Sequence, residues 1–106
     1  MKISILLPYK ENYSIQYPGA VSLFVYDTTK HSSFKKNIKI FGSTNYKSFL
    51  SKNYTNIKIS KKVLQSTSKF YVNNFIELQK KDPPNLIEVH NRPSYIKQII
   101  DKFKYK

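Results

Sequence analysis

The chain has 106 residues, which fits one small domain or a piece of a larger one. Apolar residues make up 40% and aromatics 15%, so the chain can build a packed core and is not a disordered polyelectrolyte. It has no cysteine, which excludes disulfides and thiolate metal sites. Its apolar runs are too short for a transmembrane helix of ~20 residues or for a signal peptide. We therefore expect a cytoplasmic protein, with attachment at the inner face of the membrane as a variant of that location.

The formal net charge is +13, from 19 basic and 6 acidic residues, and Arg92 is the single arginine. Lys, Asn, Ile and Tyr are residues that AT-rich codons encode, so base composition is one source of this charge. Sequence-specific nucleic-acid sites depend on the planar fork of arginine, so we expect no specific nucleic-acid partner. A solvated basic surface and peripheral contact with an anionic membrane both remain open, since a surface lysine contributes about 1 kcal/mol near anionic lipid.

The first predicted elements are a strand, a loop and a helix. Residues 2–7 are almost entirely apolar and end at a proline, which is the pattern of a strand buried on both faces. Residues 9–18 are polar and aromatic and are bounded by prolines, so they predict a loop. From Gly19, helical spacing of apolar residues predicts a broadly buried helix that fades near residues 31–33. Its two overlapping stripes are Ala20, Leu23, Phe24, Asp27 and Val21, Phe24, Val25, Thr28.

Two further strands are predicted in the middle of the chain. Residues 37–41 alternate between polar and apolar and stop at Gly42, which predicts the second strand. Residues 43–53 are polar and predict a loop that could hold a helical turn. Residues 54–59 alternate again and predict a third, shorter strand, and residues 60–62 could begin a turn or a helix.

The last third of the chain predicts a helix, a strand and a helix. Residues 69–81 have helical spacing, and the prolines after Asp82 terminate this helix. Residues 85–90 predict the fourth strand. Pro93 suits the first turn of a final helix, and residues 104–106 form a charged end. The expected buried face of the first of these helices is Val72, Phe75, Ile76 and Gln79, and the apolar stripe of the second is Tyr95 or Ile96, Ile99, Ile100 and Phe103.

This order of strands and helices predicts an α/β fold, a Rossmann-like and mainly parallel open sheet with flanking helices. We expect residues 1–106 to be a single, incomplete domain. A parallel sheet of three or four strands in about 100 residues is thin and leaves an edge open. The chain also stops directly after a strand–helix unit, so we interpret it as the front part of a longer protein.

Two polar segments follow strands, at the edge of the sheet where ligands bind in this class. In the first, Gly19 begins a helix, where free backbone N–H groups attract an anion such as a diphosphate. The dinucleotide fingerprint G-x-G-x-x-G is absent, because the other glycine is Gly42. A plain cap or turn glycine is the alternative. Glu11, in the same loop, could orient a hydroxyl or pair with Lys10.

The second segment is the tip of the fourth strand, where His90, Asn91 and Arg92 are consecutive. Histidine can act as a base or a hydrogen-bond partner at neutral pH, and a single arginine suggests a need for fork geometry or constant charge. The alternative is that Asn91 caps the helix and Arg92 lies in solvent. His31 is expected at the surface of a helix end. The sequence contains no spacing typical of a metal site, so no metal is expected.

Two blocks of the sequence, KISILLPYKENYSIQYPGAVSLFVYD and PPNLIEVHNRPSYI, resemble retaining glycosyltransferases of the GT-B architecture, and glycosyltransferase family 4 most of all. In that family a small-residue pair, usually Gly-Gly, opens the first helix, and a later strand has the form P-D-[IV]-[IV]-H-x-H-[NS]. The resemblance spans nearly the whole chain. Ala20 replaces the second glycine, and Glu88 stands where the first histidine would be.

The resemblance implies roles for individual residues. Gly19 and Ala20 match the pair whose backbone approaches the donor diphosphate. His90 matches the second histidine and is the implied catalytic residue, while Asn91 and Arg92 would line the acceptor side of the cleft as substrate-binding residues. Glu11 is a further substrate-binding candidate, taken from its place in the loop and not from the resemblance. The chain would be the amino-terminal, acceptor-side domain, inactive alone, of an enzyme that moves a sugar from a nucleotide-sugar donor to a hydroxyl of a glycan or lipid-linked acceptor. Neither a metal nor another cofactor is implied.

Two other interpretations stay open. One is a basic module that binds anionic membrane or nucleic acid, which rests on the charge of +13 alone. The other is a small α/β structural domain without a site, in which the residues at the strand ends are helix caps. Clustering of Glu11, Gly19, His90 and Arg92 around one cavity would argue against this last interpretation.

Overall fold

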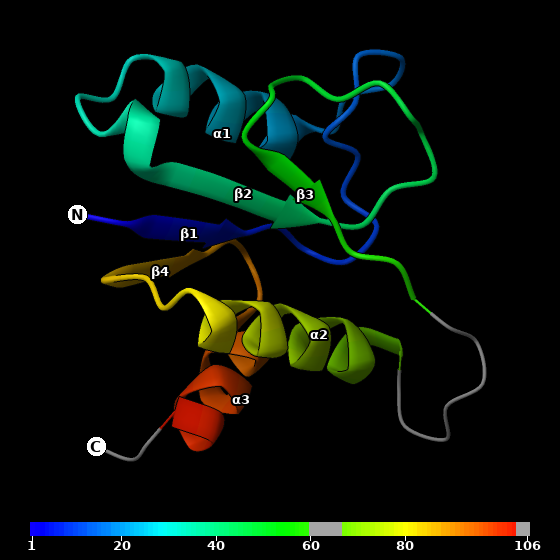
Figure 1. Ribbon diagram of the computed structural model, residues 1–106. Coiled ribbons are helices and arrows are strands. Elements are labelled where there is room, and N and C mark those ends of the chain that lie inside the picture. Colours follow the sequence, from blue (N-terminus) through cyan, green and yellow to red (C-terminus); the bar gives the residue numbers. More distant parts are fainter. Residues whose placement is uncertain (60–66, 104–106) are drawn as a thin grey trace.

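The computed structural model describes residues 1–59 and 67–103, which form four parallel strands and three α-helices (Figure 1). The predicted order of strands and helices is confirmed in these residues. The predictions for residues 60–62 and 104–106 lie outside them. In chain order the elements are β1 (Ile3–Leu6), α1 (Ala20–Lys30), the 3₁₀ turn η1 (Lys35–Asn37), β2 (Ile38–Gly42), β3 (Tyr54–Asn56), α2 (Thr67–Lys81), β4 (Leu86–Val89) and α3 (Pro93–Phe103).

The sheet has the strand order β3-β2-β1-β4 and every pairing is parallel, so the predicted Rossmann-like α/β fold is confirmed. β1 lies in the interior, with Ile3 opposite both Ile38 of β2 and Leu86 of β4. All four residues of β1 are buried, as its continuous apolar pattern predicts. β3 is shorter than predicted, because its pairing with β2 ends at Asn56.

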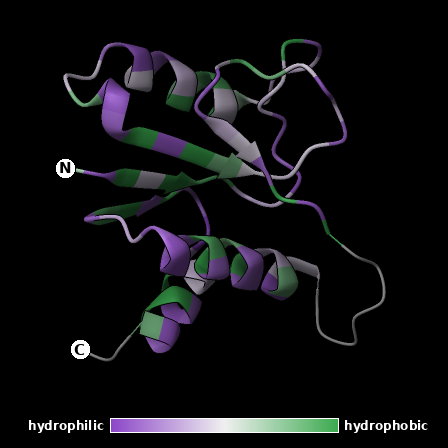
Figure 2. Ribbon diagram, viewed as in Figure 1, coloured by the Kyte–Doolittle hydropathy of each residue, from purple (hydrophilic) through white to green (hydrophobic). Residues whose placement is uncertain are grey.

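Helices cover both faces of the sheet (Figure 1). We call the side covered by α2 and α3 the α2–α3 face, and the side covered by α1 and the loops 7–19 and 43–53 the α1 face. Side chains alternate along a strand, so Leu6 contributes to the α2–α3 face while Ile3 and Ile5 contribute to the α1 face. Figure 2 shows mainly hydrophobic colour on β1 and a mixture of both colours along each helix, as expected for helices half in contact with solvent.

α2 buries the predicted face. Val72, Phe75, Ile76 and Gln79 are all buried, and the neighbouring Tyr71 is fully buried as well. The Tyr71 hydroxyl donates to the Leu7 carbonyl at 2.7 Å, and burial raises its pKa well above the usual value. In α3 the predicted stripe is confirmed at three of its four positions. Tyr95 and Ile99 are buried and Phe103 packs against the same core, whereas Ile100 is exposed, as is Ile96, the alternative to Tyr95.

The prediction of a broadly buried α1 is wrong. The helix buries only a narrow side consisting of Ser22, Val25 and Thr29. The more hydrophobic positions Leu23 and Phe24 are 46% and 58% exposed. Helical periodicity shows which residues share one side of a helix, but packing against the sheet determines which side is buried. α1 ends at Lys30, and His31 is an exposed residue at its carboxyl end, as predicted.

Candidate functional site

The carboxyl ends of β1 and β4 lie side by side, because these strands are neighbours and run in parallel. β2 and β3 follow one another on one side of β1, and β4 then pairs with the other side of β1. The order of strands therefore reverses between β1 and β4. In open α/β sheets this reversal creates the crevice in which ligands bind. The two segments singled out in the sequence lie next to this crevice, one after β1 and one after β4.

Gly19 is the N-cap residue of α1, with ordinary extended backbone angles of φ −77° and ψ 163°. Glu11 occupies the position in front of the helix, where its Oε2 accepts a hydrogen bond of 2.9 Å from the backbone N–H of Ser22. A Cβ on Gly19 would lie 2.0 Å from the same oxygen. The glycine therefore makes room for a carboxylate of the protein, and the amino end of α1 already holds an anion. Ala20 is exposed beside it.

His90 follows β4 and faces α1. Its Nε2 lies 2.6 Å from Oε2 of Glu88, and its side chain is 17% exposed. Its ring meets the ring of Phe24 edge-on, with the centroids 6.1 Å apart. Phe24 lies in α1, five residues after Gly19, so this contact brings His90 against the helix that follows Gly19. The hydrogen bond with Glu88 holds the imidazole in place.

Asn91 and Arg92 serve the turn into α3. Asn91 has a positive φ of 54°, a conformation that asparagine tolerates better than most residues. The carbonyl of Arg92 accepts a hydrogen bond from the N–H of Tyr95 in the first turn of the helix. The guanidinium bends back to its own chain, where Nη1 donates to the carbonyl of Asn91 at 2.7 Å. Both side chains are exposed, so they could contact a ligand only at the outer rim of the crevice between β1 and β4.

A large groove lies at the same edge of the sheet but on the side of β2 and β3. Its volume is about 910 Å³. Amides, hydroxyls and two tyrosines dominate its wall, and Lys10 and Lys58 are its charged groups. The full lining is Tyr9, Lys10, Asn12, Ser43, Thr44, Asn45, Tyr46, Asn56, Ile57, Lys58, Ile59 and Thr67.

Hydrogen bonds between loops form the wall of this groove. The Thr44 hydroxyl donates to Asn12 Oδ1 at 2.8 Å, which ties the loop after β2 to the loop after β1. Asn56 accepts from the N–H of Thr44 at 2.9 Å and donates to its carbonyl at 3.1 Å. The wall therefore has its shape before any ligand arrives.

None of the six predicted site residues lines this groove. The structure instead joins Glu11 to the start of α1, beside Gly19 and Ala20, and brings His90 against the same helix. Asn91 and Arg92 lie next to His90 in sequence but form the turn into α3. Sequence reasoning missed the role of Glu88, although a glutamate two residues before a histidine on a strand lies on the same face of the sheet. Sequence reasoning also missed the groove, because the residues that line it come from separate parts of the chain and form no motif.

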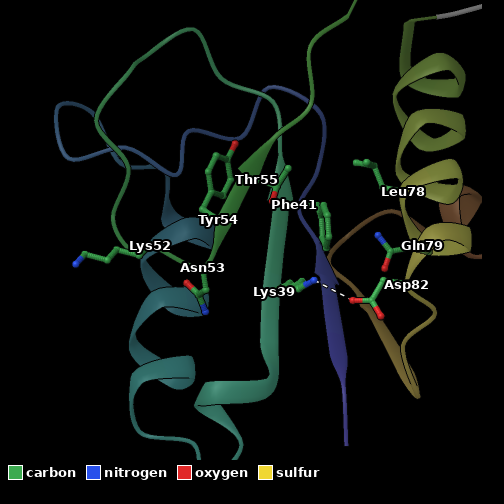
Figure 3. A pocket seen from close by; sticks show the side chains of 9 residues that line it. All are labelled: Lys39, Phe41, Lys52, Asn53, Tyr54, Thr55, Leu78, Gln79 and Asp82. Carbon is green, nitrogen blue, oxygen red and sulfur yellow. Dashed lines mark hydrogen bonds and ion pairs between the residues drawn. The ribbon is translucent and has the colours of Figure 1, made fainter.

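A smaller cavity of about 290 Å³ lies on the α2–α3 face, between the end of α2 and the strands β2 and β3 (Figure 3). Lys39 and Asp82 form an ion pair of 3.1 Å across it, and Lys2 also contacts Asp82. These hydrogen bonds lower the pKa of the exposed Asp82 carboxyl. The Gln79 amide reaches into the lining from α2, and its Oε1 accepts from Ser4 Oγ at 2.5 Å. These contacts hold the end of α2 against the sheet.

Within residues 1–59 and 67–103, no three His, Cys, Asp or Glu side chains gather to hold a metal ion. None of the helices described is long and apolar enough to cross a membrane. Comparison of the chain with protein-family models, with curated proteins and with solved structures gave no match. The site must therefore be interpreted from its own geometry.

Proposed function

We propose that this chain is the acceptor-side domain of a glycosyltransferase, which transfers a sugar from a nucleotide-sugar donor to a hydroxyl of a glycan or lipid-linked acceptor. The observation that supports this most directly is the arrangement at the carboxyl edge. The two blocks that resemble glycosyltransferases meet there through Phe24 and His90, beside a polar groove of about 910 Å³. Edges of this kind are the ligand-binding edges of Rossmann-like sheets.

The chemistry of the groove fits a polyhydroxylated ligand. Amide and hydroxyl side chains such as Asn45, Ser43 and Thr67 can exchange hydrogen bonds with sugar hydroxyls, since these groups both donate and accept. The rings of Tyr9 and Tyr46 offer apolar surface for the C–H face of a sugar ring. Lys10 and Lys58 suit an acceptor that carries a phosphate or carboxylate. We assign the acceptor to this groove.

The proposed reaction breaks the bond between the anomeric carbon and the diphosphate of the donor and forms a bond to the acceptor oxygen, whose proton passes to Nδ1 of His90. His90 is the candidate that contacts the reacting groups. Because Glu88 engages its Nε2, the Nδ1 atom is the one left to contact a substrate hydroxyl. Positive charge near the leaving diphosphate stabilises it electrostatically. Arg92 and Asn91 are the nearby groups at the outer rim.

The role of Gly19 and Ala20 in this proposal differs from the one that the resemblance implies. The carboxylate of Glu11 occupies the amino end of α1, so a diphosphate would meet an anion there. The proposal therefore requires Glu11 to turn away before the donor diphosphate can bind the N–H of Ser22. Glu11 is half-buried and sits in a loop, so this change needs a side-chain rotation only.

The acceptor assignment can be tested on the chain itself by titrating isotopically labelled protein with neutral methyl glycosides and short oligosaccharides. We expect weak, millimolar binding, with amide shifts concentrated at Thr44, Asn45 and Lys58. UDP-glucose, used as a donor probe, should shift the amides at the start of α1 instead. Shifts scattered over the surface, or no shift with any glycoside, would contradict the acceptor role.

A matched pair of double variants sharpens this test. Asn45→Ala with Lys58→Ala removes two polar side chains from the groove and should abolish the glycoside-induced shifts. Lys47→Ala with Lys102→Ala removes two exposed side chains that do not line it. This control should bind like the original chain. Equal loss of binding in both variants would mean that the glycosides do not occupy the groove.

A further inference from the structure

A third pocket lies at the opposite edge of the sheet, where the strands begin. Its volume is about 590 Å³. Its residues come from the end of α1, from η1 just before β2, and from the segment just before β3, with Tyr13 behind them. We call it the lysine pocket. Its lining is Tyr13, Tyr26, Thr29, Lys30, Lys35, Lys36, Ser51, Lys52 and Asn53.

Four lysines and no acidic residue are among the residues that line the lysine pocket. Lys30, Lys35, Lys36 and Lys52 are all exposed, and they reach the pocket from three different segments. In the described part of the chain none of them forms an ion pair. Like charges brought together without a counter-ion raise the local potential and attract anions.

Four other lysines of the described residues are paired with carboxylates, in contrast to those of the pocket. Lys2 and Lys39 share Asp82, Lys80 pairs with Glu77, and Lys97 pairs with Asp101. A random scatter of lysines on a basic protein would give no reason for the unpaired ones to converge on a cavity. Convergence of cations from separate segments is the usual architecture of an anion site.

The floor of the pocket is apolar and rigid. Tyr13 is fully buried and its hydroxyl lies 2.6 Å from Ser51 Oγ, which fixes one wall. Lys30 Nζ lies 5.1 Å from the ring centroid of Tyr26 on the other side. Thr29 lines the pocket and is only 7% exposed. Its hydroxyl is enclosed by the protein and has no hydrogen-bond partner among the described residues.

We propose that the lysine pocket binds a ligand that carries a phosphate monoester. Such a group has a charge of about −1.5 to −2 at neutral pH and three strong acceptor oxygens, so it can engage several ammonium groups at once. A carboxylate, with one charge, would leave most of the four lysines uncompensated. The phosphate could belong to a soluble metabolite or to a lipid headgroup such as phosphatidate. The site is separate from the groove at the carboxyl edge and does not depend on the function proposed for it.

The test compares three soluble probes and two vesicles. Inorganic phosphate, glycerol 3-phosphate and acetate are titrated at constant ionic strength, with binding followed by the amide resonances of Thr29, Ser51 and Lys52. The two phosphate probes should bind and acetate should not. Vesicles of phosphatidylcholine with phosphatidate are then compared with vesicles with phosphatidylserine at equal surface charge. Preference for phosphatidate over glycerol 3-phosphate identifies a lipid ligand, and equal affinity identifies a soluble one.

Two triple variants with the same charge decide whether the pocket is responsible. Lys35→Gln, Lys36→Gln and Lys52→Gln remove three cations from it and should weaken phosphate binding roughly 100-fold, given the contribution of each lysine near an anion. Lys47→Gln, Lys81→Gln and Lys102→Gln remove three exposed lysines elsewhere and should leave affinity within about twofold, because exposed charges beyond ~10 Å are screened. Equal losses in both variants, or binding of acetate as tight as phosphate, would overturn the proposal.

Discussion

The two faces of the sheet are stabilised in different ways. On the α2–α3 face two helices pack apolar side chains against the strands. Phe75 is fully buried and meets Phe41 of β2 edge-on, with ring centroids 5.2 Å apart. Val72 and Ile76 continue the same stripe of α2. This face is an ordinary packed core, in which the periodicity of the helix matches the surface it covers.

The α1 face has one helix, and loops complete its cover. Tyr13 comes from the loop after β1 and stacks on Tyr54 of β3, with centroids 4.9 Å apart and an angle of 13°. Burial raises the pKa of both hydroxyls. Phe49 and Leu50 of the loop 43–53 pack beside them. Hydrogen bonds such as that from Tyr13 to Ser51 hold these loops to the core.

The difference explains where candidate sites arise. Glu11 at the start of α1, His90 and the lysine pocket are all on the α1 side, next to loops. Loops can present hydroxyls, amides and ammonium groups without removing apolar area from the core. The α2–α3 face, by contrast, uses its polar contacts to clamp the end of α2, through Lys39 and Asp82. Apart from the groove at the carboxyl edge, which Thr67 of α2 also lines, the candidate sites thus lie on the α1 face, while the α2–α3 face mainly supplies stability.

The contrast in stability between the two faces is tested most strongly by truncating one core residue on each face. Phe75→Ala should lower the free energy of unfolding by about 3–5 kcal/mol, because it opens a cavity between α2 and β2. Val25→Ala on α1 should lower it by about 2 kcal/mol, since it removes less buried area. Urea unfolding followed by circular dichroism measures both.

If Phe75→Ala does not fold, Phe75→Leu keeps the comparison measurable and should cost less, about 1–2 kcal/mol. An effect of Val25→Ala equal to that of Phe75→Ala would show that the two faces share stability evenly. The distinction between a stabilising face and a functional face would then fail.

The fold could be predicted from the sequence because the strong local patterns of the sequence agree with the strands and helices observed. β1 is apolar at nearly every position, and the prolines before Asn85 end α2 where the structure ends it, at Lys81. Parallel strands separated by helices leave few topologies, so the order of elements nearly determines the sheet. The face of α1 could not be predicted in this way. Leu23 and Phe24 are more hydrophobic than Ser22 and Thr29, yet tertiary packing covers the latter pair.

The candidate site was predicted in part. Topology alone implies that residues after β1 and β4 share an edge, and the contact of Phe24 with His90 agrees with this. The sequence could not reveal that Glu11 fills the amino end of α1, because the bond to Ser22 depends on how a ten-residue loop folds back. It also could not reveal the lysine pocket. Lys30, Lys36 and Lys52 are scattered in the sequence and converge only through tertiary structure.

An intermediate effect is expected where a loop caps a helix on the α1 face. Gly19→Ala should lower the free energy of unfolding by about 1–2 kcal/mol, the typical contribution of an N-terminal cap. The new Cβ would lie 2.0 Å from Glu11 Oε2, so Glu11 must leave the N–H of Ser22. The backbone at Gly19 has a negative φ, so the substitution introduces no strain of its own.

Glu11→Gln is the matched control for that change. It keeps a side-chain oxygen that can accept from Ser22 and removes only the charge, so the loss should be about 0.5 kcal/mol. Thermal unfolding at low and high salt separates the two contributions, because salt screens the interaction with the helix dipole. Equal stability of Gly19→Ala and the original chain would mean that Glu11 does not stabilise α1, and the amino end of the helix would then be open to a ligand anion.

The smallest expected effect has the opposite sign and lies at the floor of the lysine pocket. Thr29→Val should raise the free energy of unfolding by about 1 kcal/mol, because the buried Thr29 hydroxyl has no partner among the described residues and valine has the same shape. Thr28→Val is the control. The Thr28 hydroxyl is bonded to the carbonyl of Phe24 at 2.9 Å and is exposed, so its loss should change stability by less than about 0.5 kcal/mol. A decrease of stability in Thr29→Val would show that the hydroxyl is already satisfied in the folded chain.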